Sequence, residues 1–376
     1  MRYYLIAGEA SGDLHGSRLI RQLRRLDPAA EIRCWGGDLM ESAGAVLVKH
    51  YRDLAFMGFA EVVRHLPEIL GNLSFCKRDI AQFAPDAVIL VDYPGFNLRI
   101  AQWAHARKFK VVYYISPQVW AWKESRVRRI RRCVDLMLVI LPFEEPFYQK
   151  WNYPVTYVGH PLLEVVRQAQ SQGPGTPISF RKIIALLPGS RKQEVLKKLP
   201  VMLAASARFA DYDFVVAQAP HMEDALMDSL LANYPNVRVV KGRTYDLLQQ
   251  AWAALVTSGT ATLETALFGV PEVVCYKGSP VSYLLAKRLI KVKYISLVNL
   301  IMDEEVVKEL IQEELQVGNL ERELSRILEG PGREKMLEDY KRLWEKLSAG
   351  DASAVAARKI LDFLSVTDTS QDGPSE

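Results

Sequence analysis

Short, continuously apolar runs recur along this chain and alternate with segments of helical spacing. Residues 87–91, for example, read Ala-Val-Ile-Leu-Val without a single polar side chain. Strands buried on both faces have this pattern, because helices cover both sides of a parallel sheet. The alternation therefore predicts an α/β fold. The expected strands are 2–7, 32–36, 87–92, 111–115, 135–140, 155–158, 183–187, 213–217, 237–240, 253–257 and 272–276.

The chain is long enough for two such domains. It has 376 residues, 49% of them hydrophobic, and a single hydrophobic core rarely serves so many. Segment 168–181 is rich in Gly, Pro and Gln, which predicts a linker between a domain at 1–167 and one at 176–344. The pattern is helical throughout 304–364, and the polar end 367–376 is expected to be disordered.

Charge and cysteine content narrow the possible functions. A net charge of +4 excludes a strongly basic nucleic-acid coat, and the excess of Lys and Arg lies in residues 1–160. The four cysteines form no CxxC pair, which favours reduced thiols in the cytoplasm. The sequence carries neither a signal-peptide core nor a run near the ~20 apolar residues of a transmembrane helix.

Two loops in the second half have the residues of a phosphate site. Pro188-Gly189-Ser190-Arg191 follows one expected strand, and Ser258-Gly259-Thr260 follows another. A helix N-terminus offers free N–H groups to an anion, and an arginine can fork onto a phosphate. Two such loops in one domain favour a diphosphate ligand, with Glu264 placed to bind ribose hydroxyls. Ordinary βα turns, and a capping box completed by Glu264, are the alternatives.

Loops of the first half carry carboxylates instead. Loop 8–13 lacks the GxGxxG pattern of dinucleotide sites, and its Glu9 and Asp13 suit hydroxyls better than phosphate. Asp92 ends an apolar strand, which makes it a candidate general base. A helix-dipole partner is the alternative for Asp13, and a helix N-cap is the alternative for Asp92.

Aromatic and basic residues suggest contacts with a lipid. Trp120 and Trp122 lie in the loop 116–122, and basic residues crowd 123–132. Apolar residues including Met57 fill 54–66 beside basic ones. An anionic substrate or membrane would explain both segments, whereas core packing and a solvated helix are the ordinary explanations.

Several other kinds of site find no support. The histidines, cysteines and carboxylates show no metal-ligand spacing, and neither a GxSxG elbow nor a Walker lysine is present. His160, in Gly-His-Pro after an expected strand, suits a backbone or hinge role better than catalysis.

Eight short blocks, in this order, resemble the lipid-A-disaccharide synthase family. They are AGEASGD (7–13), VDYPGFN (91–97), SPQVWAW (116–122), LPFE (141–144), VGHP (158–161), LLPGSR (186–191), SGTATLE (258–264) and SLVNL (296–300). The resemblance implies a GT-B fold: two Rossmann-like domains whose parallel sheets face a cleft, with C-terminal helices (345–366) returning to the first domain. It implies an inverting glycosyltransferase in lipid A biosynthesis that needs no cofactor or metal.

In that family, UDP-2,3-diacylglucosamine and 2,3-diacylglucosamine 1-phosphate are joined into a β(1→6) disaccharide 1-phosphate with release of UDP. The resemblance assigns the donor to Gly189, Ser190, Arg191, Gly242, Ser258, Gly259, Thr260, Glu264 and Asn299, and the acceptor to Ser11, Gly12, Met57 and Trp120. Asp92 is the hypothesised base, with Glu9 or Asp13 as rivals, and Arg191 assists the leaving diphosphate.

The resemblance also implies a cytoplasmic protein that contacts the inner membrane of a Gram-negative-type bacterium and binds no nucleic acid; the oligomeric state stays open. Three other classes compete with this hypothesis. They are a different UDP-sugar enzyme such as an epimerase, a nicotinamide-dependent oxidoreductase, which the missing GxGxxG disfavours, and a two-lobed binding protein without turnover.

Overall fold

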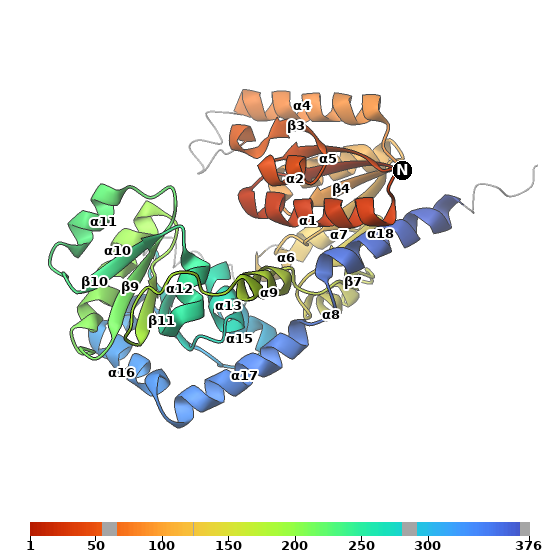
Figure 1. Cartoon of the computed structure of the whole chain (residues 1–376). Coiled ribbons are helices and arrows are strands. Elements are labelled where there is room, and N and C mark those ends of the chain that lie inside the picture. Colours follow the sequence, from red (N-terminus) through yellow and green to blue (C-terminus); the bar gives the residue numbers. More distant parts are fainter. Residues whose placement is uncertain (55–65, 123, 280–291, 369–376) are drawn as a thin grey trace, which may run out of the picture. The chain divides into compact units, whose positions relative to one another are not determined.

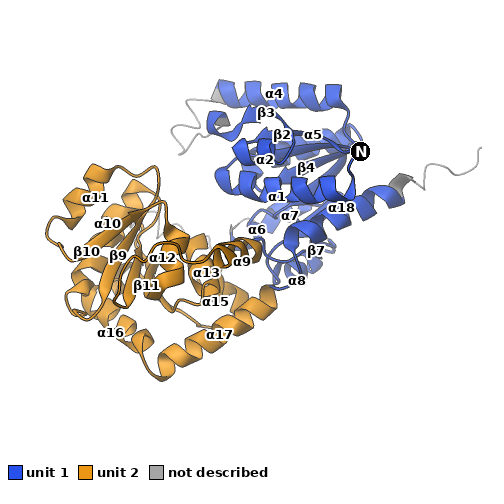
Figure 2. Ribbon diagram, viewed as in Figure 1, with its two compact units in different colours: residues 1–161, 348–376 blue, residues 162–347 orange. Residues whose placement is uncertain are grey.

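The chain forms two compact α/β units in a computed structural model, which describes residues 1–54, 66–122, 124–279 and 292–368 (Figure 1). Unit 1 comprises residues 1–161 together with the segment from 348 onward, and unit 2 comprises 162–347 (Figure 2). Each unit is built around one parallel sheet.

The sheet of unit 1 has the order β3-β2-β1-β4-β5-β6-β7, and each of its described strand pairs is parallel. Its strands are β1 (Arg2–Ala7), β2 (Glu31–Gly36), β3 (Val46–His50), β4 (Ala87–Val91), β5 (Lys110–Tyr114), β6 (Leu136–Val139) and β7 (Thr156–Tyr157). The strand order reverses direction between β1 and β4, the place where ligands bind in open α/β sheets.

The helices of unit 1 cover this sheet. They are α1 (Ala10–Leu26), α2 (Asp38–Ser42), α4 (Leu66–Phe83), α5 (Pro94–Ala106), α6 (Val119–Trp122), α7 (Val127–Ile130), α8 (Glu144–Gln149) and α18 (Ala352–Asp368), with short 3₁₀ turns at Tyr51–Leu54 and Glu124–Arg126. Proline at the first position of α5 suits the helix start, since its fixed φ is already helical.

Unit 2 repeats the design, with the sheet order β10-β9-β8-β11-β12-β13 and parallel pairs. Its strands are β8 (Ile183–Leu187), β9 (Asp213–Gln218), β10 (Val237–Lys241), β11 (Ala251–Thr257), β12 (Glu272–Tyr276) and β13 (Lys308–Ile311). Its helices are α9 (Leu162–Gln172), α10 (Lys192–Ser206), α11 (Asp224–Leu231), α12 (Thr244–Gln250), α13 (Thr260–Leu267), α15 (Leu297–Met302), α16 (Val317–Leu328) and α17 (Pro331–Leu347), with a 3₁₀ turn at Gln312–Glu314.

The core of unit 1 has two layers because side chains alternate across a strand. Val88 and Leu90 belong to one buried cluster, and Ile89 and Val91 belong to the other. The α/β prediction is therefore confirmed in its main feature, strands that are apolar on both faces.

Two edge strands were not expected. β3 (Val46–His50) is an edge strand of the sheet in unit 1, and β13 (Lys308–Ile311) is an edge strand of the sheet in unit 2. Their sequences contain charged residues, which a strand with one free edge tolerates, so neither forms a continuous apolar run. The purely helical interpretation of 304–364 is wrong at β13.

The boundary between the units differs from the predicted one. α9 (Leu162–Gln172), which the sequence divided between the first domain and the linker, belongs to unit 2, where it contacts α12 and α13. At the other end, α18 lies in unit 1 and packs on α1, so a C-terminal helix returns to the first unit. The tail expected at 367–376 lies largely outside the described residues.

The packing of α18 can be tested at Ile360, which is fully buried among the side chains of α1 and the sheet. We expect Ile360→Ala to lower the free energy of unfolding of unit 1 by about 3 kcal/mol, because it removes buried methylenes and leaves a cavity. Urea denaturation measures this. The exposed neighbour Lys359 provides the control: Lys359→Ala should change stability by less than about 0.5 kcal/mol. Equal midpoints for the two variants would contradict the packing of α18 on unit 1.

Candidate functional site

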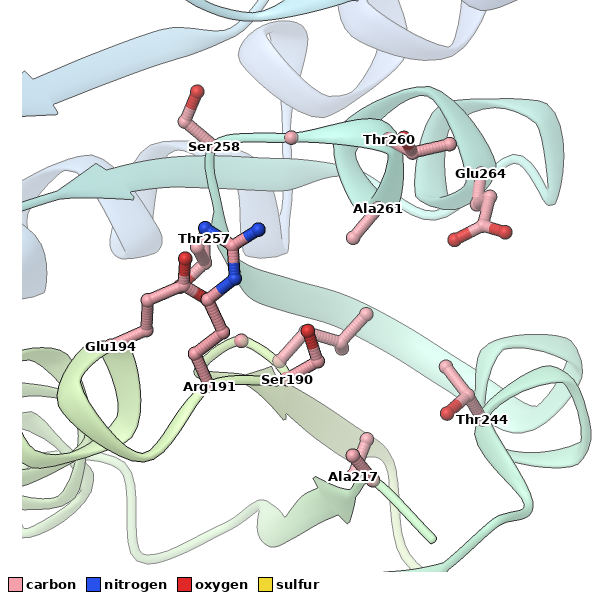
Figure 3. Close-up of a pocket in the computed structure, with 14 residues that line it drawn as sticks. Ser190, Arg191, Glu194, Ala217, Thr244, Thr257, Ser258, Thr260, Ala261 and Glu264 are labelled. Carbon is pink, nitrogen blue, oxygen red and sulfur yellow. The ribbon is translucent and has the colours of Figure 1, made fainter. Parts of the chain in front are cut away.

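A polar pocket of about 460 Å³ opens in unit 2 where β8 and β11 end. It brings together both loops that the sequence singled out for phosphate (Figure 3). Its lining residues are Leu187, Gly189, Ser190, Arg191, Glu194, Ala217, Ala219, Thr244, Thr257, Ser258, Gly259, Thr260, Ala261 and Glu264. Seven of the residues predicted to hold the donor therefore share one pocket.

Glycines shape both loops. Gly189 has φ +112°, and a Cβ there would lie 2.4 Å from the carboxylate of Glu194. Gly259, the N-cap of α13, has φ +151°. Residues with a side chain rarely adopt these positive φ values, whereas glycine does so readily. The helices α10 and α13 begin directly after these loops, so their unpaired N–H groups favour an anion at this end of the sheet.

Arg191 is the cation of the pocket. It is the N-cap residue of α10, and Figure 3 shows its side chain extending from the start of α10 toward the loop after β11. Among the described residues it has no ion pair within 4.0 Å, although Glu194 also lines the pocket. A guanidinium left without a partner beside two helix N-termini suits a phosphate ligand.

Glu264 lies one turn into α13 and is held in place by a hydrogen bond from Tyr245 Oη, at 2.7 Å from Glu264 Oε1. Burial raises the pKa of its carboxyl, an effect that the Tyr245 hydrogen bond opposes. Thr244, at the start of α12, brings a further hydroxyl to the pocket. The resemblance indicates this loop through Gly242 but does not include Thr244 or Tyr245.

Two predicted donor residues are placed differently. Gly242 lies in the loop after β10 but does not line the pocket, where Thr244 does. Asn299 is fully buried: its amide donates to Val307 O and Glu309 Oε1, and its oxygen accepts from the N–H groups of Val306 and Val307. The donors and acceptors of its side-chain amide are therefore all used within the protein.

The cluster around Asn299 nevertheless reaches the pocket indirectly. Glu309 accepts hydrogen bonds from the N–H groups of Ile295 and Ser296. The carbonyl of Ile295 in turn accepts the hydroxyl of Ser258, at 3.0 Å. This chain of contacts fixes the rotamer of Ser258 and orients the loop after β11.

In unit 1, Asp92 follows β4 and has an unusual backbone. Asp92 and Tyr93 have φ of +45° and +48°, a left-handed conformation that costs a non-glycine residue about 1–2 kcal/mol. The Asp92 side chain is half-buried. Burial raises the pKa of its carboxyl to about 6, and the negative charge of Glu9 adds to this rise. A carboxylate with such a pKa suits general-base work near neutral pH.

The two rivals of Asp92 have different surroundings. Glu9 is exposed and is the N-cap residue of α1. Asp13 is buried, and its carboxylate accepts hydrogen bonds from the backbone N–H groups of Gly37, Leu39 and Met40 at 2.8–3.2 Å. Asp13 therefore caps α2, a structural role that accounts for its burial.

Three of the residues predicted to bind the acceptor also differ in their surroundings. Ser11 is exposed in the first turn of α1. Gly12 is buried, and a Cβ there would lie 3.0 Å from the Cβ of Ala7, so its role is close packing of α1 on β1. Met57 lies outside the described residues.

The segment after β6 contains a buried carboxylate that the sequence did not indicate. Glu144 is 1% exposed and accepts from the N–H groups of Ile140 and Leu141. Burial raises the pKa of its carboxyl to about 7, while the hydrogen bonds from these two backbone N–H groups oppose the rise. Trp120 is half-buried and packs edge-on against Phe143, so it is in part a packing residue.

A cluster of cations follows the loop 116–122. Two neighbouring hollows of about 310 and 530 Å³ share Arg128 and Arg132. The basic residues that line them are Arg128, Arg129, Arg131, Arg132, Lys150 and His105. We call Arg128, Arg129, Arg131, Arg132 and Lys150 the basic cluster. Within the described part of the chain, none of these five forms an ion pair closer than 4.0 Å.

Neither a metal centre nor a membrane-spanning helix is found among the described residues. In the described ranges, no group of three or more His, Cys, Asp and Glu could hold a metal ion. No helix there is both long and apolar enough to cross a bilayer. His160 is buried, and its burial, together with the proximity of His15, lowers its pKa to about 3.

Sequence comparison relates the chain to one family. Residues 3–360 match the family described as lipid-A-disaccharide synthetase. The chain is 40% identical to the lipid-A-disaccharide synthase of Geobacter metallireducens over 373 residues, covering 96% of this chain and 97% of that protein. It is 42% identical to that of Syntrophus aciditrophicus over 376 residues, covering 97% and 98%.

Solved structures show the same fold at low sequence identity. The glycosyltransferase of kitacinnamycin superposes with a TM-score of 0.70 at 16% identity, covering 96% of this chain and 99% of that one. The UDP-GlcNAc 2-epimerase from Neisseria meningitidis bound to UDP-GlcNAc gives 0.68 at 12% identity, covering 96% and 100%. These likenesses establish the GT-B architecture of two parallel-sheet domains.

Proposed function

The chain belongs to the lipid-A-disaccharide synthase family, and from that premise we propose how its residues share the work of the reaction. The family's members are glycosyltransferases that form the disaccharide of lipid A. The donor is UDP-2,3-diacylglucosamine and the acceptor is 2,3-diacylglucosamine 1-phosphate. The geometry of each unit supports a particular role for its residues.

The pocket of unit 2 is the proposed UDP site. The observation that carries this assignment is the meeting of Arg191, two helix N-termini and the Glu264 carboxylate around one pocket. Arg191 and the amides of the two loops would hold the diphosphate, and Glu264 would accept hydrogen bonds from the ribose. The Neisseria epimerase of the same fold binds UDP-GlcNAc, which supports a UDP-sugar here.

Asp92 is the proposed general base. It takes the proton of the acceptor's 6-hydroxyl, and the oxygen attacks C1 of the donor sugar. The bond from C1 to the diphosphate oxygen breaks, and its electron pair leaves with UDP. Attack opposite the leaving group inverts the configuration at C1. Arg191 and the N–H groups stabilise the charge that develops on the diphosphate, an electrostatic contribution of the oxyanion-hole kind.

These roles predict that two substitutions both lower turnover but differ in their effect on UDP affinity. Arg191→Ala should weaken UDP binding and lower turnover, because it removes the pocket's cation. Asp92→Asn should leave UDP affinity nearly unchanged and lower kcat by about 100-fold or more, the usual contribution of a general base. Calorimetric titration with UDP and an assay of disaccharide 1-phosphate measure the two effects.

Arg208→Ala is the matched control, since Arg208 is exposed on the same unit and pairs with Glu321 away from the pocket. It should leave both UDP affinity and kcat unchanged. Normal turnover in Asp92→Asn would remove the base assignment, and normal UDP affinity in Arg191→Ala would remove the diphosphate assignment.

The basic cluster of unit 1 is the proposed contact with the membrane. Its cations lie close together without carboxylate partners among the described residues, and Arg128 and Arg132 are exposed. Anionic headgroups attract such clusters. The lipid substrates reside in a membrane, so peripheral contact on this face of unit 1 would bring the protein to them.

We expect the double variant Arg128→Ala/Arg132→Ala to bind vesicles of phosphatidylcholine and phosphatidylglycerol roughly tenfold more weakly than the unchanged protein. Binding should also weaken as salt rises, because salt screens exposed charges. Vesicle sedimentation measures both effects.

The control Arg21→Ala/Arg25→Ala removes two exposed charges from α1 and should bind as the unchanged protein does. An equal loss in the two double variants would show that net charge, and not the basic cluster, governs binding.

A further inference from the structure

The backbone around Asp92 is held in a conformation that its own sequence does not favour. Asp92 and Tyr93 are consecutive left-handed residues without glycine, with φ of +45° and +48°. Non-glycine residues are strained in the left-handed region of φ and ψ, so the surrounding structure must hold these two residues there. The conformation sets the direction in which the Asp92 side chain leaves the end of β4.

Two side chains from neighbouring elements hold the carbonyl of Asp92. Tyr113 Oη, from β5, donates to it at 2.7 Å. Asn97 Nδ2, from α5, donates to the same oxygen at 2.8 Å. A carbonyl oxygen has two lone pairs, so both are used, and the peptide plane between Asp92 and Tyr93 is fixed from two sides.

The donors are themselves rigid. Tyr113 and Asn97 are fully buried. Asn97 Nδ2 also lies 3.3 Å from the carbonyls of Ile6 and Val91, which ties the ends of β1 and β4 together. Burial raises the pKa of the Tyr113 phenol well above its usual value, and the charge of Asp92 contributes, so the hydroxyl keeps its proton and remains a donor.

The ring of Tyr93 is fixed as well. A Cβ on Gly8 would lie 2.3 Å from Tyr93 Cδ1, which means that the ring lies directly against the backbone after β1. The Tyr93 ring also stacks with the ring of Phe96, with 5.8 Å between their centroids. Only glycine leaves room for the ring at position 8, and this explains the first glycine of the loop 8–13 without any ligand.

We propose that Tyr113, together with Asn97, is a positioning residue for the Asp92 carboxylate. The proposal rests on the proposed function of Asp92 as the base. The Tyr113 hydroxyl contacts the backbone carbonyl of Asp92 and not the reacting atoms. Tyr113 acts by keeping the Asp92 carboxylate in the direction that the reaction requires. Loss of that hydrogen bond lets the peptide relax out of the left-handed region and moves the carboxylate.

The test is Tyr113→Phe, which removes only the hydroxyl. We expect kcat to fall between about 10-fold and 100-fold, the cost of a displaced catalytic group, while UDP affinity and the KM for the donor stay within about twofold. The full-length protein is assayed for disaccharide 1-phosphate, and UDP affinity is measured by calorimetry.

Tyr153→Phe is the matched control. Tyr153 is also buried in unit 1 and donates its hydroxyl to a backbone carbonyl, that of Val134, at 3.0 Å. Val134 precedes β6 and so lies at the other end of the sheet from Asp92. Both variants lose a buried hydrogen bond of the same kind, so urea midpoints should fall by similar amounts, but only Tyr113→Phe should lose turnover.

The outcomes separate this proposal from the proposed function. Normal kcat in Tyr113→Phe beside an inactive Asp92→Asn would overturn the positioning role and leave the base assignment standing. Normal kcat in Asp92→Asn would overturn the base itself. Equal losses of kcat in Tyr113→Phe and Tyr153→Phe would reduce the effect of Tyr113 to general stability and overturn the proposal.

A second variant keeps the test decisive if Tyr113→Phe does not fold. Gly8→Ala keeps both hydrogen bonds to Asp92 O but displaces the Tyr93 ring. It should lower kcat with little change in UDP affinity, since the pocket that binds UDP lies in unit 2. Full activity in Gly8→Ala would show that the Asp92–Tyr93 conformation is not needed, and would overturn the proposal.

Discussion

The parallel hydrogen bonding of the two sheets is the constraint on which the rest of the structure depends. In a parallel sheet every strand ends at the same edge, so loops far apart in sequence become neighbours. The loops after β8 and β11, near residues 190 and 258, meet in one pocket for this reason. In unit 1 the same geometry brings Glu9, after β1, close to Asp92, after β4.

The two units use this edge for opposite electrostatic tasks. In unit 2, helix N-termini and Arg191 create a site for negative charge. In unit 1, burial and the negative charge of Glu9 raise the pKa of Asp92 to about 6. A transferase needs both environments, because a leaving diphosphate must gain stabilisation while a hydroxyl loses its proton.

Much of this design could be predicted from the sequence, because buried parallel strands leave apolar runs and phosphate loops leave Gly, Ser and Arg at strand ends. What escaped prediction depends on contacts across the fold. Asp13 caps α2, twenty-five residues or so away in the chain, and Asn299 is satisfied by β13 and its neighbours. In the sequence, Tyr113 is an ordinary strand residue. Only the pairing of β5 with β4 brings its hydroxyl to the carbonyl of Asp92.

The pH dependence of kcat is the most direct test of the central claim, that Asp92 is the base and that Glu9 raises its pKa. The base must be unprotonated, so activity should fall below about pH 6. In Glu9→Gln the neighbouring negative charge is gone, the pKa of Asp92 falls, and the acidic limb should move to lower pH. Glu31→Gln, at the distant start of β2, should leave it in place. An acidic limb unmoved by Glu9→Gln would contradict the account.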